Sequence, residues 1–190
     1  MRVSNFKCYT KYQLDAVGAV LVEGAMSVQI AIDNYDDLFS DFDIRGYEER
    51  YFSSDFLNEL RMRTIKLFSK KELEIVFVID KTERNATYEA IISGRLKLFF
   101  NNRYERNNRK RKKLLFDAVL LEMIGIAFML ITMYLDKYDL NYFKEFMLIP
   151  SWFFIWNGLE KYIYNAKILD KKVAYYSKLK KAAIRFEDIG

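Results

Sequence analysis

The pattern of hydrophobic and polar positions changes near residue 82. Before it, the apolar segments are short: residues 28–32 alternate apolar and polar side chains, and residues 73–79 form a nearly unbroken apolar run. Both patterns are typical of β-strands. Between them, Ser53 and Ser54 precede residues 55–68, whose apolar side chains fall on one side of a helix, as in an N-capped amphipathic helix. Residues 1–81 therefore predict a small α/β domain with a strand–helix–strand unit.

Two strands make a poor independent sheet, so the predicted domain needs a further strand. Residues 14–22 are apolar enough to supply one, although the same segment also fits a short helix. The other source is a neighbouring subunit that completes the sheet. The sequence leaves both alternatives open.

Residues 82–135 contain no proline and predict one long helix. Its second part, residues 114–135, is a run of 22 mostly apolar residues. A helix rises about 1.5 Å per residue, so roughly 20 residues cross a hydrocarbon core that is about 30 Å thick. The run predicts a membrane-spanning helix, and a dense basic block at residues 103–113 lies directly before it.

A second apolar stretch covers residues 146–159 and has only 14 uncharged residues. Alone, that length suits a buried or re-entrant helix better than a span. Aromatic side chains on both flanks extend it as interface anchors do, and we interpret residues 144–162 as a second span with Pro150 near its start. The last segment, residues 165–190, alternates lysine with apolar residues and predicts an amphipathic helix.

These elements predict an α+β fold. It consists of a cytoplasmic α/β sensor domain (1–81), a connecting basic helix (82–113), a transmembrane hairpin (114–164, with spans at 114–135 and 144–162) and a cytoplasmic C-terminal amphipathic helix (165–190). Cations gather before the first span and after the second, so the positive-inside rule places both termini in the cytoplasm. The side chains expected at the membrane interface are Trp152, Trp156, Tyr138, Arg109, Lys110 and Arg111.

The composition narrows the possible chemistry. The chain has no histidine and one cysteine, Cys8, so it lacks the commonest general base and transition-metal ligand, and it cannot form an internal disulfide or a thiolate zinc site. It also has no glycine-rich phosphate loop. We expect no enzymatic activity, no cofactor and no bound metal. The net charge of +5 suits anionic lipid or nucleic acid and does not separate the two.

Two carboxylates lie inside the first predicted span. Glu122 is about two turns deep, and Asp117 is nearer the basic edge. A charge at bilayer depth costs at least about 2.5 kcal/mol, so such residues usually face a bundle interior or a water-filled path. Glu122 is the main candidate for a pore-lining or inter-helix polar residue, and a structural hydrogen bond between helices is the alternative interpretation.

Five aspartates between residues 33 and 43 form an acidic cluster. Their spacing does not match an EF-hand loop, and a hard-cation site is the minor alternative. Acidic runs are usually solvated faces. The favoured interpretation is that this loop pairs with Arg45, Arg50 or the arginines of another subunit.

Residues 30–60 read IAIDNYDDLFSDFDIRGYEERYFSSDFLNEL. This aspartate-rich pattern, with LIPSWFFIWNGLEKYIY at residues 148–164 and YSKLKKAAIRFED at residues 176–188, is similar to that of small two-span bacterial membrane proteins. Over about residues 28–188, the chain resembles the membrane effectors of Hailong-type anti-phage defence. It has Ile44-Arg45-Gly46 where that family pattern has Pro-Arg-Pro, so we expect a looser turn there.

The resemblance implies a homo-oligomeric ion channel of the bacterial inner membrane, expected to be a tetramer, that a single-stranded DNA oligomer holds closed. A partner nucleotidyltransferase would make this oligomer, and its loss would open the channel and depolarise the cell. Charge alone selects the candidate DNA contacts: Arg45, Arg50, Arg61, Arg63, Lys66 and Lys70. The rival interpretations are a non-channel membrane scaffold that anchors a cytoplasmic partner and, more remotely, a membrane-bound metal enzyme that uses the acidic cluster.

Overall fold

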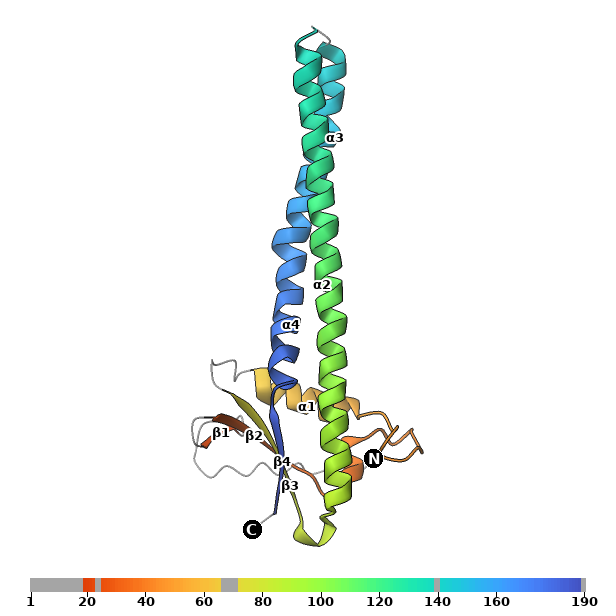
Figure 1. Cartoon of the computed structure of the whole chain (residues 1–190), viewed down its shortest axis with the longest axis vertical. Helices are drawn as coiled ribbons and strands as arrows, with labels where there is room; N and C mark the ends of the chain where they lie inside the picture. Colours follow the sequence, from red (N-terminus) through yellow and green to blue (C-terminus); the bar gives the residue numbers. More distant parts are fainter. Residues whose placement is uncertain (1–18, 23–24, 66–71, 139–140, 189–190) are drawn as a thin grey trace. The chain divides into compact units, whose positions relative to one another are not determined.

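The computed structural model describes residues 19–22, 25–65, 72–138 and 141–188 (Figure 1). The chain forms two compact units. The α/β unit comprises Met1–Asn101 and Tyr175–Gly190, and the helical unit comprises Asn102–Ala174. The α/β unit therefore contains both ends of the chain, and it is not confined to the first 81 residues as the sequence predicted.

A four-stranded sheet lies at the centre of the α/β unit, with strand order β1-β2-β3-β4. β1 (Ala19–Val22) pairs antiparallel with β2 (Ala25–Ala31), whereas β2, β3 (Leu73–Ile79) and β4 (Ala183–Asp188) run parallel. The two strands predicted from the alternating pattern and the apolar run are confirmed. β1 covers the last part of the segment predicted as strand or helix, and residues 14–18 lie outside the described residues.

The C-terminal segment corrects one prediction. We expected residues 165–190 to form a single amphipathic helix, but α4 (Ala166–Leu179) stops at Leu179 and β4 follows it. Several lysines precede a short alternating pattern, which is therefore hard to recognise as a strand. In this pattern, Ile184 and Phe186 pack against the core and lie opposite Ile75 and Phe77 of β3 in the strand register. The chain's own C-terminus thus supplies the parallel partner that the sheet needed.

Two helices and an ordered loop cover the core face of the sheet. α1 (Ser54–Ile65) contributes Phe56 and Leu60, and the start of α2 contributes Ile92, Leu96 and Phe100. Residues 33–53 add a 3-10 turn, η1 (Tyr35–Leu38), whose Tyr35, Leu38 and Phe39 also belong to the core. β3 is buried along almost its whole length, as expected for a central strand between parallel neighbours.

α2 (Ala86–Asp136) is one uninterrupted helix of 51 residues, which confirms the prediction of a long helix. It begins later than Thr82 because residues Lys81–Glu83 form a separate 3-10 turn, η2, capped by Asp80. The side chain of Asn85 then accepts hydrogen bonds from the backbone N–H groups of Thr87 (3.0 Å) and Tyr88 (3.3 Å), as an N-cap does. α2 supplies residues to both units.

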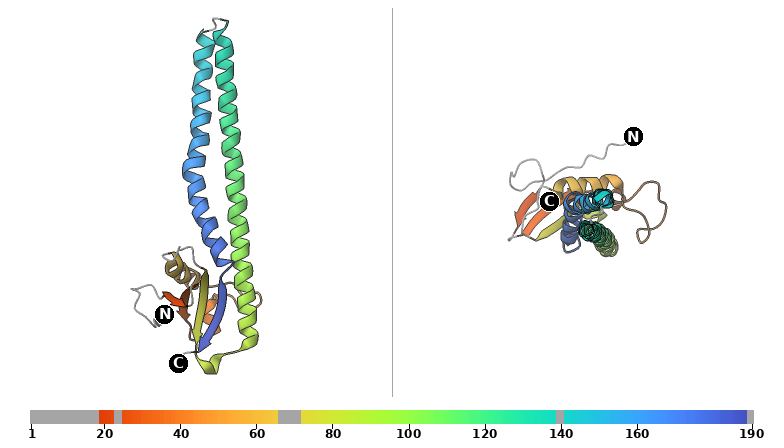
Figure 2. Two further views of the ribbon diagram at one scale, coloured as in Figure 1. Left: turned by 60° about the vertical axis from the view of Figure 1, so that its left-hand side comes forward. Right: turned by 90° about the horizontal axis from the view of Figure 1, so that it is seen from above.

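In the helical unit, the chain turns after α2 and returns as α3 (Asn141–Glu160), which has Pro150 in its interior. A π-helical turn, η3 (Lys161–Asn165), leads without a break into α4. We call α3, η3 and the start of α4 the return arm. Figures 1 and 2 show this arm running beside α2 in the opposite direction.

Candidate functional site

Every fully buried residue in the described part of the helical unit is small. α2 buries Ala118, Gly125 and Thr132, spaced seven residues apart, and the return arm buries Ser151, Gly158 and Ala166. A seven-residue repeat keeps one face of a helix toward its partner. Small residues on that face let two helices approach closely, which is the usual packing of helices inside membranes.

The two glycines are the points of closest approach. A Cβ atom on Gly125 would lie 2.6 Å from Ile155 Cγ1 and 2.9 Å from the Ile155 backbone N. A Cβ atom on Gly158 would lie 3.0 Å from the Ala118 carbonyl oxygen. The Ser151 hydroxyl donates a hydrogen bond of 2.9 Å to the Gly125 carbonyl. Any larger side chain at either glycine would therefore push the helices apart.

The large apolar side chains of the helical unit point outward. Phe116, Met123, Leu130, Phe146 and Ile149 are each at least 60% exposed. A helical pair in water has the opposite arrangement, with its large apolar residues between the helices. Contiguous exposed apolar surface of this extent marks contact with lipid or with other protein. Among the described residues, α2 is the one helix that is long and apolar enough to cross a membrane.

Two ion pairs lie near the ends of this helical pair. Arg111 on α2 pairs with Asp170 on α4, and Asp136 at the end of α2 pairs with Lys144 on α3. The helix from Arg111 to Asp136 rises by about 37 Å, which exceeds the hydrocarbon core of about 30 Å and falls short of the whole bilayer. The charged ends and the apolar middle thus match the layers of a membrane.

Glu122 lies beside the contact between the two helices. A Cβ atom on Gly158 would meet Glu122 Cγ at 2.6 Å, so the Glu122 stem packs over bare backbone of α3. The Glu122 side chain is half-buried, as is that of Asp117. No described residue forms an ion pair or a side-chain hydrogen bond with the Glu122 carboxylate. Among the described residues, Glu122 therefore does not form the hydrogen bond between helices that was its alternative interpretation.

The residues predicted at the membrane interface occupy different levels. Ser151 and Ile155 contact Gly125, so Trp152 and Trp156 lie opposite the middle of the 114–135 run rather than at its ends; both are more than 60% exposed. Tyr138 follows the end of α2 and accepts a 3.2 Å hydrogen bond from Tyr134. Arg109 and Lys110 are exposed at the opposite end, next to the paired Arg111.

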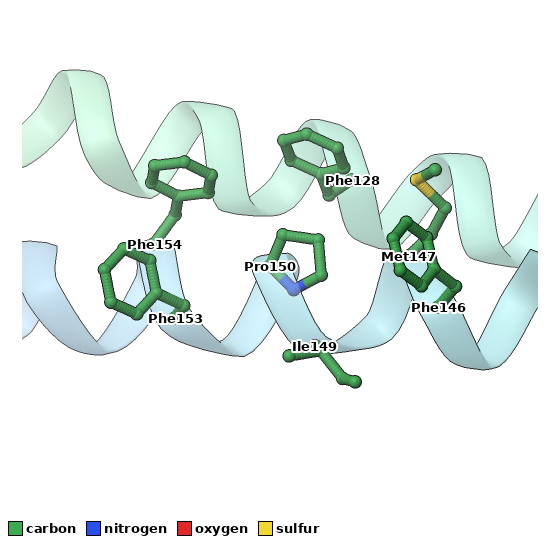
Figure 3. Close-up of a pocket in the computed structure, with 7 residues that line it drawn as sticks. All are labelled: Phe128, Phe146, Met147, Ile149, Pro150, Phe153 and Phe154. Atoms are coloured by element: carbon green, nitrogen blue, oxygen red, sulfur yellow. The ribbon is translucent and has the colours of Figure 1, made fainter.

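Beside Pro150, the two helices leave an apolar groove. Figure 3 shows Phe128 of α2 facing Pro150 of α3, whereas Ile149 points away from α2. All seven lining residues are apolar: Phe128, Phe146, Met147, Ile149, Pro150, Phe153 and Phe154. A binding site for a small polar ligand needs a few polar groups to orient it, and this groove has none.

Two of the four described candidates for DNA contacts are engaged by other groups of the α/β unit. Arg63 is buried, with its guanidinium bonded to Glu59 and to the Gln29 carbonyl. Arg50 pairs with Asp36 at 2.6 Å, and its side chain is only 16% exposed. Arg45 forms an ion pair with Asp43, but its side chain remains 42% exposed. Arg61 is exposed on α1. Lys66 and Lys70 lie outside the described residues.

The acidic cluster folds on its neighbouring arginines, as predicted. Besides the Arg50–Asp36 pair, the Arg45 guanidinium donates hydrogen bonds of 2.9 and 2.8 Å to Asp43. These bonds and one from the Tyr51 backbone N–H hold the pKa of the Asp43 carboxyl well below its usual range. Among the described residues, no group of three histidine, cysteine, aspartate or glutamate side chains is placed to hold a metal ion.

Sequence reasoning missed Arg95, which holds this loop against α2. Its guanidinium donates to the carbonyls of Tyr47 and Arg50 and lies over the rings of Phe39 and Phe52, at 5.7 and 5.3 Å from their centroids. Burial lowers the pKa of Arg95. Nothing near Arg95 in the sequence pointed to loop carbonyls more than 40 residues away.

A second polar network joins three distant segments of the α/β unit. Arg84 pairs with Glu89 (2.8 Å) and with Asp188 of β4 (2.7 Å), and the Tyr35 hydroxyl accepts a 2.8 Å hydrogen bond from the Asn85 backbone N–H. Burial is the main cause that raises the pKa of Tyr35. The network fastens the end of β4 and the η1 loop to the start of α2, so its role is structural.

Comparisons of this chain with protein-family models, with curated proteins and with solved structures give no match. The resemblance to Hailong effectors therefore stays a prediction. The assignment of the site residues is based on their geometry alone.

Proposed function

We propose that this chain is a membrane protein in which α2 and the return arm both cross the bilayer. The pairing of β3 with β4 carries the proposal. β3 precedes α2 in the chain and β4 follows the return arm. Neighbouring strands lie about 4.8 Å apart, so a bilayer cannot separate them. If α2 crosses, the chain must cross back before β4, and the return arm is the segment that does so.

The return arm suits a second crossing despite its short apolar stretch. Its apolar middle is bounded by Lys144 and Glu145 at one end and by Glu160 and Lys161 at the other. Such side chains reach the interface by extending along the helix. Its small buried residues pack against α2, and its large ones face outward. Tyr162 and Tyr164, both exposed, fall near the basic end, where interface aromatics belong.

Charge supports the orientation in which both termini are cytoplasmic. Seven cations lie between residues 103 and 113, whereas the opposite end of the helical unit has only Lys137 and Lys144 as cations. The positive-inside rule assigns the basic end to the cytoplasm. The α/β unit, which holds both the strand before the pair and the strand after it, then lies in the cytoplasm too.

Together with the resemblance, this architecture supports an oligomeric effector channel gated by a ligand of the α/β unit. Two helices cannot enclose a water-filled path, so several copies must surround it. Glu122 is the residue that we assign to the path or to a contact between subunits, because intramembrane carboxylates face water or protein. The ligand proposed from the resemblance is a DNA oligomer that favours the closed state, and its removal shifts the population toward the open state.

The α/β unit contains eighteen cationic and eighteen acidic residues. A DNA oligomer would therefore need a local basic patch, because the unit has no net attraction for phosphate. Arg45 and Arg61 are the described candidates with exposed side chains. Arg50 and Arg63 contribute to the stability of the unit instead.

Ion flux from liposomes that contain the purified chain tests the channel. We expect flux that a DNA oligomer suppresses, and a lower cation-to-anion permeability ratio in Glu122→Gln, because acidic side chains favour cations in a pore. Glu83→Gln, which changes an exposed carboxylate of the α/β unit, serves as the matched control and leaves the ratio unchanged. Intact oligomers without flux in any ligand state would refute the channel.

The second candidate is a membrane scaffold that anchors a cytoplasmic partner. The observation that favours it is the packing of the Glu122 stem on Gly158. This packing gives Glu122 a role in the contact between helices that requires no ion path. Under this function the topology is the same, flux is absent, and Glu122→Gln affects stability alone.

A further inference from the structure

We propose that the cationic end of the helical unit is a binding surface for the phosphate headgroups of anionic phospholipids. We call this surface the basic collar, and it comprises residues 102–113 of α2 and residues 161–174 of the return arm. The proposal rests on the two crossings proposed above and adds to them a specific lipid class.

The basic collar concentrates the positive charge of the whole chain. It holds eleven cationic side chains and two acidic ones, whereas the chain as a whole has a net charge of +5. The remaining residues therefore carry a net negative charge. A surface with this local excess attracts anions, and each cation near an anionic membrane contributes about 1 kcal/mol.

Cations from the two helices occupy matching levels in the basic collar. Counting along both helices from the Arg111–Asp170 ion pair places Lys113 near the level of Lys167 and Arg109 near the level of Lys171. All four of these side chains are exposed. Like charges at similar levels of neighbouring helices repel each other, and Asp170 is the one carboxylate of the return arm in this region. Bound phosphate groups would relieve the repulsion.

The depth of the basic collar favours lipid over nucleic acid. Residues 103–113 directly precede the apolar run and extend about 15 Å along the helix. They therefore reach from the headgroup layer into the water within about two Debye lengths of it. A phospholipid phosphate is fixed at this depth. A nucleic acid would have to lie against an anionic membrane surface to reach the same side chains.

The chain contains its own probe for the lipids that surround it. Its two tryptophans are Trp152 and Trp156, and both are exposed on the outside of the helical unit. Lipids with brominated acyl chains quench tryptophan fluorescence on contact. Competition between brominated and ordinary lipids in reconstituted vesicles therefore measures the relative affinity of the full-length chain for phosphatidylglycerol over phosphatidylcholine.

We expect a preference for phosphatidylglycerol of about fivefold, which corresponds to one cation near an anionic surface. The preference falls by about half or more in the triple variant Arg106→Gln, Arg109→Gln and Lys110→Gln, which retains the other cations of the basic collar, and it weakens as salt rises. The control variant changes three exposed cations of the α/β unit that are not candidate DNA contacts, Lys81→Gln, Lys97→Gln and Lys181→Gln, and retains the preference.

Each other outcome overturns the proposal. Equal affinity for both lipids in the wild-type chain shows that the basic collar does not select anionic lipid. Equal loss in both triple variants shows a nonspecific charge effect. Loss of the preference when a single-stranded oligonucleotide is added, with binding of that oligonucleotide abolished in the collar variant, assigns the collar to nucleic acid. Absence of quenching by either lipid would instead refute the membrane crossings themselves.

Discussion

At the residue scale, two glycines allow the two helices of the helical unit to pack closely, because they have no side chain. Gly125 accepts the approach of Ile155, and Gly158 accepts that of Ala118 and Glu122. Neither glycine has a positive φ angle, so space between the helices, and not backbone conformation, requires them. The close contact explains the presence of Gly125 in a helix interior, where glycine costs about 1 kcal/mol of stability relative to alanine.

Replacing Gly158 with leucine should separate α2 from the return arm. Overpacking of this kind costs about 1–3 kcal/mol, and the leucine would meet the Ala118 carbonyl, which cannot move aside. Thermal unfolding of the reconstituted protein measures the effect as a lower Tm. Ala127→Leu is the control, since Ala127 is exposed on α2. Equal Tm values for the two variants would contradict the close contact.

The Asp43 carboxyl makes the ordered loop sensitive to acid. Its pKa is lowered, chiefly by the hydrogen bonds from Arg45, so the folded state binds the proton less tightly than the unfolded state. The resulting stabilisation is fully present above the ordinary carboxyl pKa and is lost as pH falls below it. We expect the Tm of Asp43→Asn to vary less than that of the wild-type chain between pH 5 and pH 3 (roughly the range of an unperturbed carboxyl), and an unchanged profile would contradict this role.

At the element scale, β4 shows where pattern reading fails. β3, α2 and α1 followed their patterns: β3 is an apolar run, α2 contains no proline, and α1 begins at Ser54, directly after Ser53. β4 has only six residues, with two apolar positions toward the core. A strand that short has little periodicity of its own. Its identity depends on β3, more than 100 residues earlier in the chain.

Phe186→Ala tests the contribution of β4. The Phe186 ring stacks on Phe77 at 5.1 Å and meets the edge of Tyr35 at 6.1 Å. Removing a half-buried ring should cost about 2–3 kcal/mol, somewhat less than for a fully buried phenylalanine. Chemical denaturation of the full chain, followed by circular dichroism, measures the change. Glu187→Ala on the same strand, with an exposed side chain, should cost less than about 0.5 kcal/mol; equal costs would argue against β4 as part of the core.

At the scale of the whole molecule, the α/β unit closes only after the chain has passed through the helical unit twice. This is why a boundary at residue 81 could not define the domain. It also constrains the topology, because β3, which precedes the helical pair, and β4, which follows it, are neighbours in one sheet. A protein with a single crossing would leave β4 on the wrong side of the membrane and β3 without one of its neighbours.

Cysteine labelling in sealed vesicles checks this topology. In a Cys8→Ser background, we expect Lys81→Cys and Lys181→Cys to react with a membrane-impermeant maleimide from the same side. Lys137→Cys, between α2 and α3, should react only from the other side. Labelling of all three positions from one side would show that α2 does not cross. Opposite sidedness of positions 81 and 181 would contradict the parallel pairing of β3 with β4.

The sequence by itself determined the elements whose signal is local. An apolar run of sufficient length, a helix without proline and an acidic loop beside arginines each carry their own evidence in consecutive residues. Only the tertiary structure decided that β4 completes the sheet, that Arg50 and Arg63 are bonded internally, and that the tryptophans lie opposite the middle of the apolar run. Each of these depends on which distant residue lies opposite, because burial, ion pairing and helix register are set by pairs of segments and not by one.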